Sequence, residues 1–315
     1  MSKIPAVLSY PDSNNLGDFI QSLAAKQCLK GEEILFLDRD QLHQYSEKKA
    51  SLLMNGWFME IPENWPPSEG ISPLFISFHL NPTAKKAMLS AAGIAYFKKH
   101  QPIGCRDYYT QKLLTNVGIE SYYSACLTLS LNRSDFISKN KKREGIYVIS
   151  PMERLNPDHQ GKTKGNVRRV LTQLKKTIRL KKYKRARNRL ESFLEKQREP
   201  VFFSSQLCDS TKHSEQDRIE LARKQLERIA SAKLVITSRI HTALPAVAFG
   251  TPILFISDGL DHPNQKSRLE GMEQFFPILN SKDLWKWESE LPKPSTNHLP
   301  FVKKFKKEIT RFLKE

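Results

Sequence analysis

An arginine and a histidine stand two positions apart at the end of an apolar run, in the stretch "VITSRIHTALPAVAFGTPILFI". Leu234–Thr237 and Ile253–Ile256 read as buried strands, and the alanine-rich segment between them reads as a short helix. In parallel α/β sheets, ligands bind beyond the carboxyl ends of the strands, where the next helix begins. Backbone N–H groups at that helix start favour anions, and Arg239 adds a fork that suits a phosphate or a carboxylate. We therefore predict an anion site at Arg239 and His241.

Two more charged residues follow expected strands in the first half of the chain. Asp18 lies near the start of a helix in "SYPDSNNLGDFIQSLA". Its carboxylate is either a helix-terminal acid or a general base that faces the site. Arg106, in "PIGCRDYYT", is either half of a local ion pair with Asp107 or a second cation at a strand end.

Alternating strands and helices must position these residues. Two successive series of strand and helix predict an α/β fold with two Rossmann-like domains facing a cleft, at 1–135 and 143–300. A basic helical insertion occupies 162–198, and a last helix at 301–315 braces the chain. The expected strands are Ala6–Ser9, Ile34–Leu37, Leu74–Phe78, Pro102–Cys105, Ser121–Tyr123, Gly145–Ile149, Val201–Ser204, Leu234–Thr237 and Ile253–Ile256.

Composition limits the class of protein. The 315 residues include 39% hydrophobic residues, enough for a sizeable core. Four cysteines without paired spacing argue against a zinc site or a disulfide framework and fit a reducing compartment. The amino-terminal apolar run is too short for a signal peptide, and no run of about 18 apolar residues exists. We expect a cytoplasmic protein that needs no metal.

The positive charge is concentrated in one segment. Residues 162–198 hold 15 Lys and Arg against two Glu, a local +13 within a formal net charge of +18. Apolar residues from Leu171 to Phe193 recur at roughly helical spacing, which predicts a helix with one apolar face and cationic remaining faces. Such a helix is either a solvated surface or a contact for an anionic partner. The inner membrane leaflet suits it better than nucleic acid, because only Tyr183 offers an aromatic ring for stacking.

Five stretches taken together resemble the polysaccharide pyruvyl transferase family. They are "NNLGDFIQSLA", "MNGWF", "PIGCRDYYT", "YYSACLTLSL" and "VITSRIHTALPAVAFGTPILFI", spread over roughly 8–260. The resemblance implies a fold like that of the GT-B glycosyltransferases. It also implies transfer of the pyruvyl group of phosphoenolpyruvate onto two hydroxyls of a sugar, in a polysaccharide or its lipid-linked precursor, with release of phosphate. Arg239 and His241 match the family's Arg-x-His, which is associated with phosphoenolpyruvate.

The substrate's chemistry then assigns roles to particular residues. A phosphate and a carboxylate need several cations, so Arg106, Arg239 and Arg268 are candidate clamps, with backbone donors near Ile240. A general acid and a general base are required, and His241 and Asp18 are the candidates. Some family members carry a lysine in a place where this chain reads "SDGLDHPNQKSRLEG", so Lys266 or Arg268 takes that role. Acceptor binding is assigned to Asn15, Asn55 and Trp57, although most tryptophans belong to cores. We expect no cofactor.

Two other functions compete with this interpretation. A GT-B glycosyltransferase that uses a nucleotide-sugar donor would have the same fold. A protein that binds RNA or another anionic polymer through 162–198 would need no catalytic site.

Overall fold

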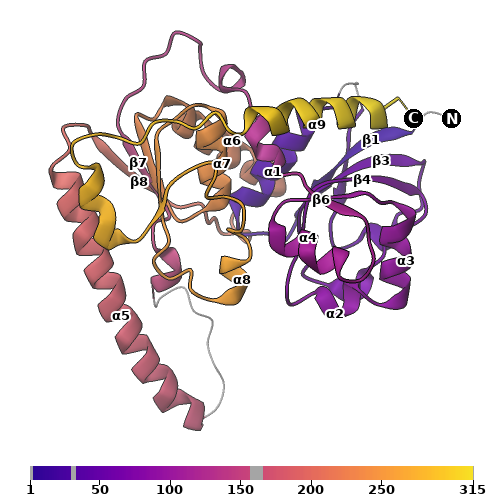
Figure 1. Ribbon diagram of the computed structural model, residues 1–315, viewed down its shortest axis with the longest axis horizontal. Helices are drawn as coiled ribbons and strands as arrows, with labels where there is room; N and C mark the ends of the chain where they lie inside the picture. The colour runs from indigo at the N-terminus through magenta and orange to yellow at the C-terminus, as the bar shows by residue number, and fades with distance from the viewer. Residues whose placement is uncertain (1–2, 30–32, 157–165, 315) are drawn as a thin grey trace.

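The computed structural model describes residues 3–29, 33–156 and 166–314, the side chains of 166–175 excepted, and is an α/β protein with two parallel sheets. The first sheet belongs to the amino-terminal half (Figure 1). Its strands, in the order β2-β1-β3-β4-β5-β6, are β1 (Ile4–Ser9), β2 (Leu35–Asp38), β3 (Ala50–Phe58), β4 (Ile71–Leu80), β5 (Ile103–Cys105) and β6 (Ser121–Tyr123).

The second sheet belongs to the carboxyl-terminal half. Its strands, in the order β11-β10-β9-β7-β8, are β7 (Ile146–Ile149), β8 (Val201–Ser204), β9 (Leu234–Thr237), β10 (Ile253–Ile256) and β11 (Ile278–Leu279). All the pairings in both sheets are parallel. Two parallel sheets with interleaved helices are consistent with the predicted Rossmann-like units.

The described α-helices are interspersed among the strands along the chain. They are α1 (Leu16–Lys26), α2 (Lys85–Met88), α3 (Ala91–Lys99), α4 (Tyr108–Thr115), α5 (Asn166–Glu195), α6 (Glu215–Ser231), α7 (Ile240–Ala248), α8 (Pro263–Lys266) and α9 (Leu299–Phe312). Polar side chains fix several of their starts. Asn15 caps α1 by accepting from the Gly17 N–H, and Ser214 opens α6 with a capping box to Asp217.

Three elements differ from the sequence prediction: strands β3 and β11 were not expected, and one expected helix is divided in two. The expected list lacks β3, which fills the middle of the first sheet between β1 and β4, so "MNGWF" is the end of a strand. This strand carries Ser51 and Asn55 on an otherwise apolar run, and burial of these two polar side chains hides the usual pattern. The helical pattern over Lys85–Ala92 predicts one helix, but the structure divides it between α2 and α3, because Ser90 caps α3 by accepting from the Gly93 N–H.

Helix α5 projects from the carboxyl-terminal half as one long rod (Figure 1). Ala186, Leu190 and Phe193 are buried against the second sheet, as an amphipathic helix requires. Ile178, however, is 57% exposed, so the predicted continuous apolar face is wrong over the earlier turns. Leu171 and Leu174, and the segment 162–165, lie outside the residues or side chains that the structure describes.

The two halves share one hydrophobic core. It joins β1, β3 and β4 to α6, α7 and β10, and α1 packs on both α6 and α7. At the far end of the chain, α9 returns to the first half (Figure 1), where Phe305 and Ile309 pack on Val7, Leu53 and Ile76. The carboxyl ends of strands from both sheets are thereby brought toward one shared region.

Candidate active site

Helix α7 begins where β9 ends, and a set of hydroxyl contacts holds that junction. The Thr237 hydroxyl donates to the Ile149 carbonyl at 2.6 Å and accepts from the Arg239 N–H at 3.0 Å. The Ser238 hydroxyl accepts from the Met152 N–H at 2.8 Å. Neighbouring strands thus fix Arg239 as the N-cap of α7. Its side chain and the first turn of α7 face the carboxyl end of the sheet, as the sequence pattern requires.

The Arg239 guanidinium pairs with a carboxylate that the sequence did not single out. Arg239 Nε donates to Glu153 Oε2 at 2.8 Å, and Nη2 contacts the same oxygen. Glu153 follows β7 in a 3₁₀ turn at Glu153–Leu155. The two side chains are 14% and 8% exposed, so this pair is screened less than a surface pair.

His241 lies at the bottom of a narrow recess. It is 2% exposed, and its Nε2 has no hydrogen-bond partner within the described part of the chain. The recess holds about 30 Å³ and is also lined by Arg239, Ile240 and Arg268. Burial, followed by the charges of Arg106 and Arg268, holds the pKa of His241 well below its usual range. The imidazole is therefore neutral at pH 7 when no anion is present.

Arg268, and not Lys266, reaches this site. Arg268 lines the recess and two adjoining cavities, whereas Lys266 is exposed at the end of α8 and lines none of the three. The Arg268 Nε has no hydrogen-bond partner among the described residues. Burial, reinforced by the charge of Arg106, lowers the pKa of Arg268 to about 9. A half-buried guanidinium at a cavity wall with an open donor is suited to an anionic ligand.

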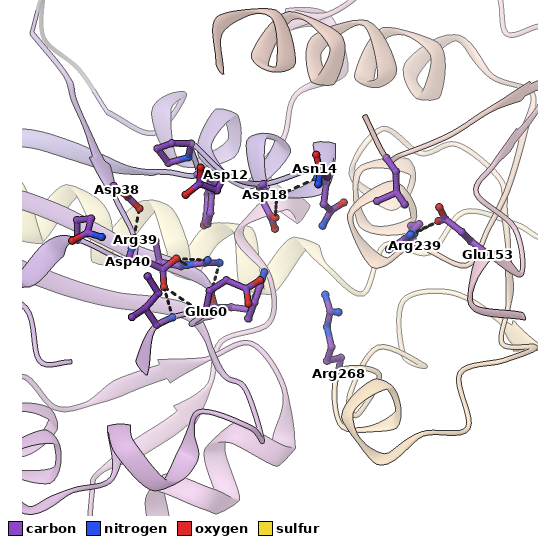
Figure 2. Close-up of a pocket in the computed structure, with 18 of the residues that line it drawn as sticks. Asp12, Asn14, Asp18, Asp38, Arg39, Asp40, Glu60, Glu153, Arg239 and Arg268 are labelled. Carbon is purple, nitrogen blue, oxygen red and sulfur yellow. Dashed lines mark hydrogen bonds and ion pairs between the residues drawn. The ribbon is translucent and has the colours of Figure 1, made fainter. Parts of the chain in front are cut away.

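The recess opens into a cavity of about 630 Å³ that residues of both halves line. Figure 2 shows Arg239 and Glu153 on one side and the side chains of Asp12, Asp38 and Asp40 on the other. Arg268 extends into the space between Asp18 and Arg239 (Figure 2). Arg154 and Arg179 add to the cationic side, and the Arg179 side chain donates to the Arg154 carbonyl. Arginines therefore outnumber the one carboxylate, Glu153, on the wall from the second half, and carboxylates outnumber the one arginine, Arg39, on the wall from the first half.

Asp18 and Asn15 line this cavity from the start of α1. Asp18 is 3% exposed and accepts from the Ser13 hydroxyl at 2.6 Å and from Gln21 Nε2 at 3.3 Å. The Asn15 Oδ1 accepts from the Gln206 amide at 2.9 Å, besides capping α1. The first turn of α1 is thus tied to the second half of the chain at the edge of the cavity.

Of the three remaining candidates, Trp57 lines a cavity, whereas Arg106 and Asn55 do not. Trp57 lines the cavity, with the Arg39 guanidinium 4.4 Å from its ring centroid. Arg106 is fully buried, its Nε lies 3.7 Å from the Asp107 carboxylate, and it lines none of the three cavities. Asn55 is 2% exposed and donates to the Gln21 carbonyl at 3.0 Å, so its side chain is turned toward α1 and away from these cavities.

The described residues also bear on metal binding and on membrane insertion. Over the described ranges, no group of three or more His, Cys, Asp or Glu side chains is arranged to hold a metal ion. Within the same residues, no helix combines the length and the apolar character needed to span a bilayer.

The fold and the site together are a parallel α/β frame with a buried imidazole in a recess that two arginines also line. Comparison with protein families adds the particular class: the model of the family described as polysaccharide pyruvyl transferase matches residues 15–259. The chain belongs to the polysaccharide pyruvyl transferase family, as its motifs predicted, and is therefore a transferase. A search of curated proteins finds no match. The family match includes Asp18, Arg239 and His241 and ends before Arg268.

Proposed function

We propose that this transferase moves the pyruvyl group of phosphoenolpyruvate onto two hydroxyls of one sugar, forming a cyclic ketal and releasing phosphate. One observation carries the choice of donor. The neutral His241 imidazole, with an open Nε2, lies in a recess that Arg239 and Arg268 also line. A donor with a phosphate, a carboxylate and a carbon that must be protonated uses all three groups.

Donor binding follows from the charges at this recess. Arg239 and Arg268 bind the phosphate and the carboxylate of the donor, and the N–H groups of Ile240 and His241 at the start of α7 contribute further donors. Glu153 holds the Arg239 fork in place before the donor arrives. Because the recess is small, it accepts only one end of the donor, and the rest extends into the larger cavity.

His241 is the proposed general acid. The anionic groups of the donor offset the cations that depress its pKa, so the imidazole takes up a proton when the donor binds. Transfer of that proton to the methylene carbon gives a methyl group and an oxocarbenium-like centre at the neighbouring carbon. One sugar hydroxyl adds there and loses its proton, the bond to the phosphate oxygen breaks, and a second hydroxyl closes the ring and loses its own proton. Asp18 is the proposed general base for one of these steps.

We further propose a division of labour in a GT-B-like arrangement. Residues 1–135 hold the acceptor, with Asn15 and Trp57 at the cavity, and residues 143–300 hold the donor. This division is supported by the excess of carboxylates on one wall of the cavity and the excess of arginines on the other. Anions prefer the cationic wall, while carboxylates accept hydrogen bonds from sugar hydroxyls.

The proposed acceptor is lipid-linked, and α5 is the proposed contact with the anionic face of the membrane. Support comes from its described turns, where Lys181, Lys182, Lys184 and Arg185 are exposed around the same rod. Exposed Ile178 and Leu180 provide apolar side chains between these cations. Cations on a projecting helix are attracted to anionic headgroups, and the attraction weakens as salt is added.

Donor binding is tested by calorimetry with phosphoenolpyruvate and, separately, with a panel of nucleotide sugars. We expect heat from phosphoenolpyruvate alone, and binding only to a nucleotide sugar would refute the proposed donor. His241→Gln tests the acid. It is expected to keep most of the affinity and to lose turnover by about 10²–10⁴-fold, the range typical of general acids.

A further inference from the structure

A second histidine faces the same region of the molecule from the first sheet. His79 lies near the carboxyl end of β4, is 1% exposed, and lines a cavity of about 230 Å³ next to the main one. This side cavity shares Trp57, Glu60, Arg154 and Arg268 with the main cavity. His79 therefore lines a cavity that has Arg268, one of the proposed donor-binding residues, in its wall.

The His79 ring is held by a buried carboxylate. Its Nδ1 lies 2.6 Å from Asp107 Oδ2, and the other oxygen of Asp107 accepts from the Thr110 N–H at 2.9 Å. Asp107 is fully buried and caps α4, so neither oxygen can turn away without breaking the first turn of that helix. Burial alone would raise the pKa of Asp107, but its contact with His79, the charge of Arg106 and the hydrogen bond from the Thr110 N–H hold that pKa below its usual range.

This arrangement determines which ring nitrogen carries the proton. An ionised Asp107 can only accept, so His79 Nδ1 must donate to it. The Thr110 hydroxyl, 3.2 Å from the same nitrogen, already accepts from the Leu80 N–H. The lone pair is then on Nε2, for which no hydrogen bond exists within the described residues. An oriented imidazole with an open lone pair at a cavity wall has the form of a general base.

The proposed reaction leaves a place for such a group, because ketal formation removes protons from two sugar hydroxyls and Asp18 accounts for only one. We propose that His79 is a catalytic residue that accepts the proton of one acceptor hydroxyl through Nε2, with Asp107 as its positioning residue. This inference rests on the proposed function. The O–H bond of the sugar breaks and its oxygen bonds to the oxocarbenium-like carbon of the donor, whose double-bond electron pair returns to the phosphate-bearing oxygen. The proton becomes an N–H of imidazolium.

Electrostatics around the dyad are compatible with this role. Burial, opposed by Asp107 and reinforced by Arg106 and Arg268, lowers the pKa of His79 to about 4, so the ring is neutral and able to accept a proton. Donor phosphate at Arg268 would offset one of the cations that lower it. Asp107 then stabilises the imidazolium that forms, as the carboxylate of a catalytic triad does.

The test compares wild type with His79→Gln, and His43→Gln serves as a matched control because His43 is exposed on the same half. Calorimetry gives the affinity for phosphoenolpyruvate, and mass spectrometry with galactoside and mannoside acceptors gives the turnover. We expect His79→Gln to bind phosphoenolpyruvate within about threefold of wild type and to lose at least 10²-fold in turnover. Imidazole added to a His79→Gly variant should restore part of that loss.

Asp107→Asn keeps the size of the side chain and an oxygen for the cap, and it provides a second variant if His79→Gln does not fold. Asp107→Asn should bind the donor but lose turnover to a similar extent. An amide can donate to Nδ1, which moves the ring proton to Nε2, so that Nε2 can no longer accept the proton of a sugar hydroxyl. Near-wild-type turnover in either folded variant overturns the role of His79 and leaves the proposed function intact. Failure of the wild type to bind phosphoenolpyruvate overturns the proposed function, and this inference with it.

Discussion

Replacing Arg239 with methionine is expected to weaken phosphoenolpyruvate binding more than the loss of one cation explains. Hydrogen bonds to charged groups contribute about 1.5–3 kcal/mol, which is about 10- to 150-fold in affinity. The change also leaves the Glu153 carboxylate, only 8% exposed, facing an anionic ligand without the guanidinium that now pairs with it. Two like charges about 6 Å apart repel by up to about 3 kcal/mol at an effective dielectric constant near 20.

The two contributions add to roughly 1.5–6 kcal/mol for Arg239→Met, a loss of about one to four orders of magnitude in affinity. The double variant Arg239→Met, Glu153→Gln removes the repelling charge as well. It should therefore bind phosphoenolpyruvate at least about tenfold more tightly than Arg239→Met alone, although it has lost more of the native contacts. Glu153→Gln alone should bind at least as tightly as wild type, because it removes a negative charge from an anion site.

Calorimetric titration of phosphoenolpyruvate into the four proteins completes the cycle. Arg228→Met, which changes an exposed arginine of α6, controls for loss of one positive charge elsewhere. Unchanged affinity in Arg239→Met would refute the assignment of Arg239 to the donor. A double variant no better than the single one would refute the electrostatic role given to Glu153.

Three further predictions follow from the same features. Burial and then nearby cations depress the pKa of His241, and the anionic donor offsets the cations, so phosphoenolpyruvate binding should take up a proton near pH 7. The binding enthalpy should therefore vary with the ionisation enthalpy of the buffer, and it should cease to vary in His241→Gln. The pKa of His79 is about 4 in the folded protein and about 6.5 in the unfolded chain, so the unfolded chain binds more protons between these two pH values. The free energy of unfolding should therefore fall by up to about 3 kcal/mol as the pH drops from 6.5 to 4. The groups facing His79 are Asp107, Arg106 and Arg268, and a melting temperature as acid-sensitive in His79→Gln as in wild type would contradict this. Changing Lys181, Lys182 and Lys184 of α5 to glutamine should weaken binding to anionic vesicles about 100-fold at low salt, at about 1 kcal/mol for each lysine. The control changes three exposed lysines of α9, Lys303, Lys306 and Lys307, and an equal loss from that control would contradict a role for α5.

Much of the frame could be predicted from local patterns. Strand β9, helix α7 and strand β10 show a short apolar run, a glycine stop and a second apolar run, and the structure confirms these elements in that order. The position of Arg239 as N-cap follows from the same pattern. Strand β3 was missed because buried Ser51 and Asn55 interrupt its apolar sequence, and a strand buried on both faces has no alternation to detect.

The site was harder to predict because its contacts join distant segments. Glu153 meets Arg239 across 86 positions, and His79 meets Asp107 across 28. A usable signal existed, because Glu153 and His79 both follow the carboxyl end of an expected strand. Arg239 was singled out by the same kind of position. Arg268 could not be separated from Lys266 by sequence, because which of two neighbouring cations turns inward depends on the path of the chain around α8.

The most direct test of the account is the fate of phosphoenolpyruvate in the presence of an acceptor sugar. Purified protein is incubated with phosphoenolpyruvate and galactosyl or mannosyl acceptors, free and lipid-linked, and both the product mass and the released phosphate are measured. We expect an acceptor carrying one pyruvyl ketal for each phosphate released, and loss of both signals in Arg239→Met. Glycosyl transfer from a nucleotide sugar, with phosphoenolpyruvate left intact, would contradict it.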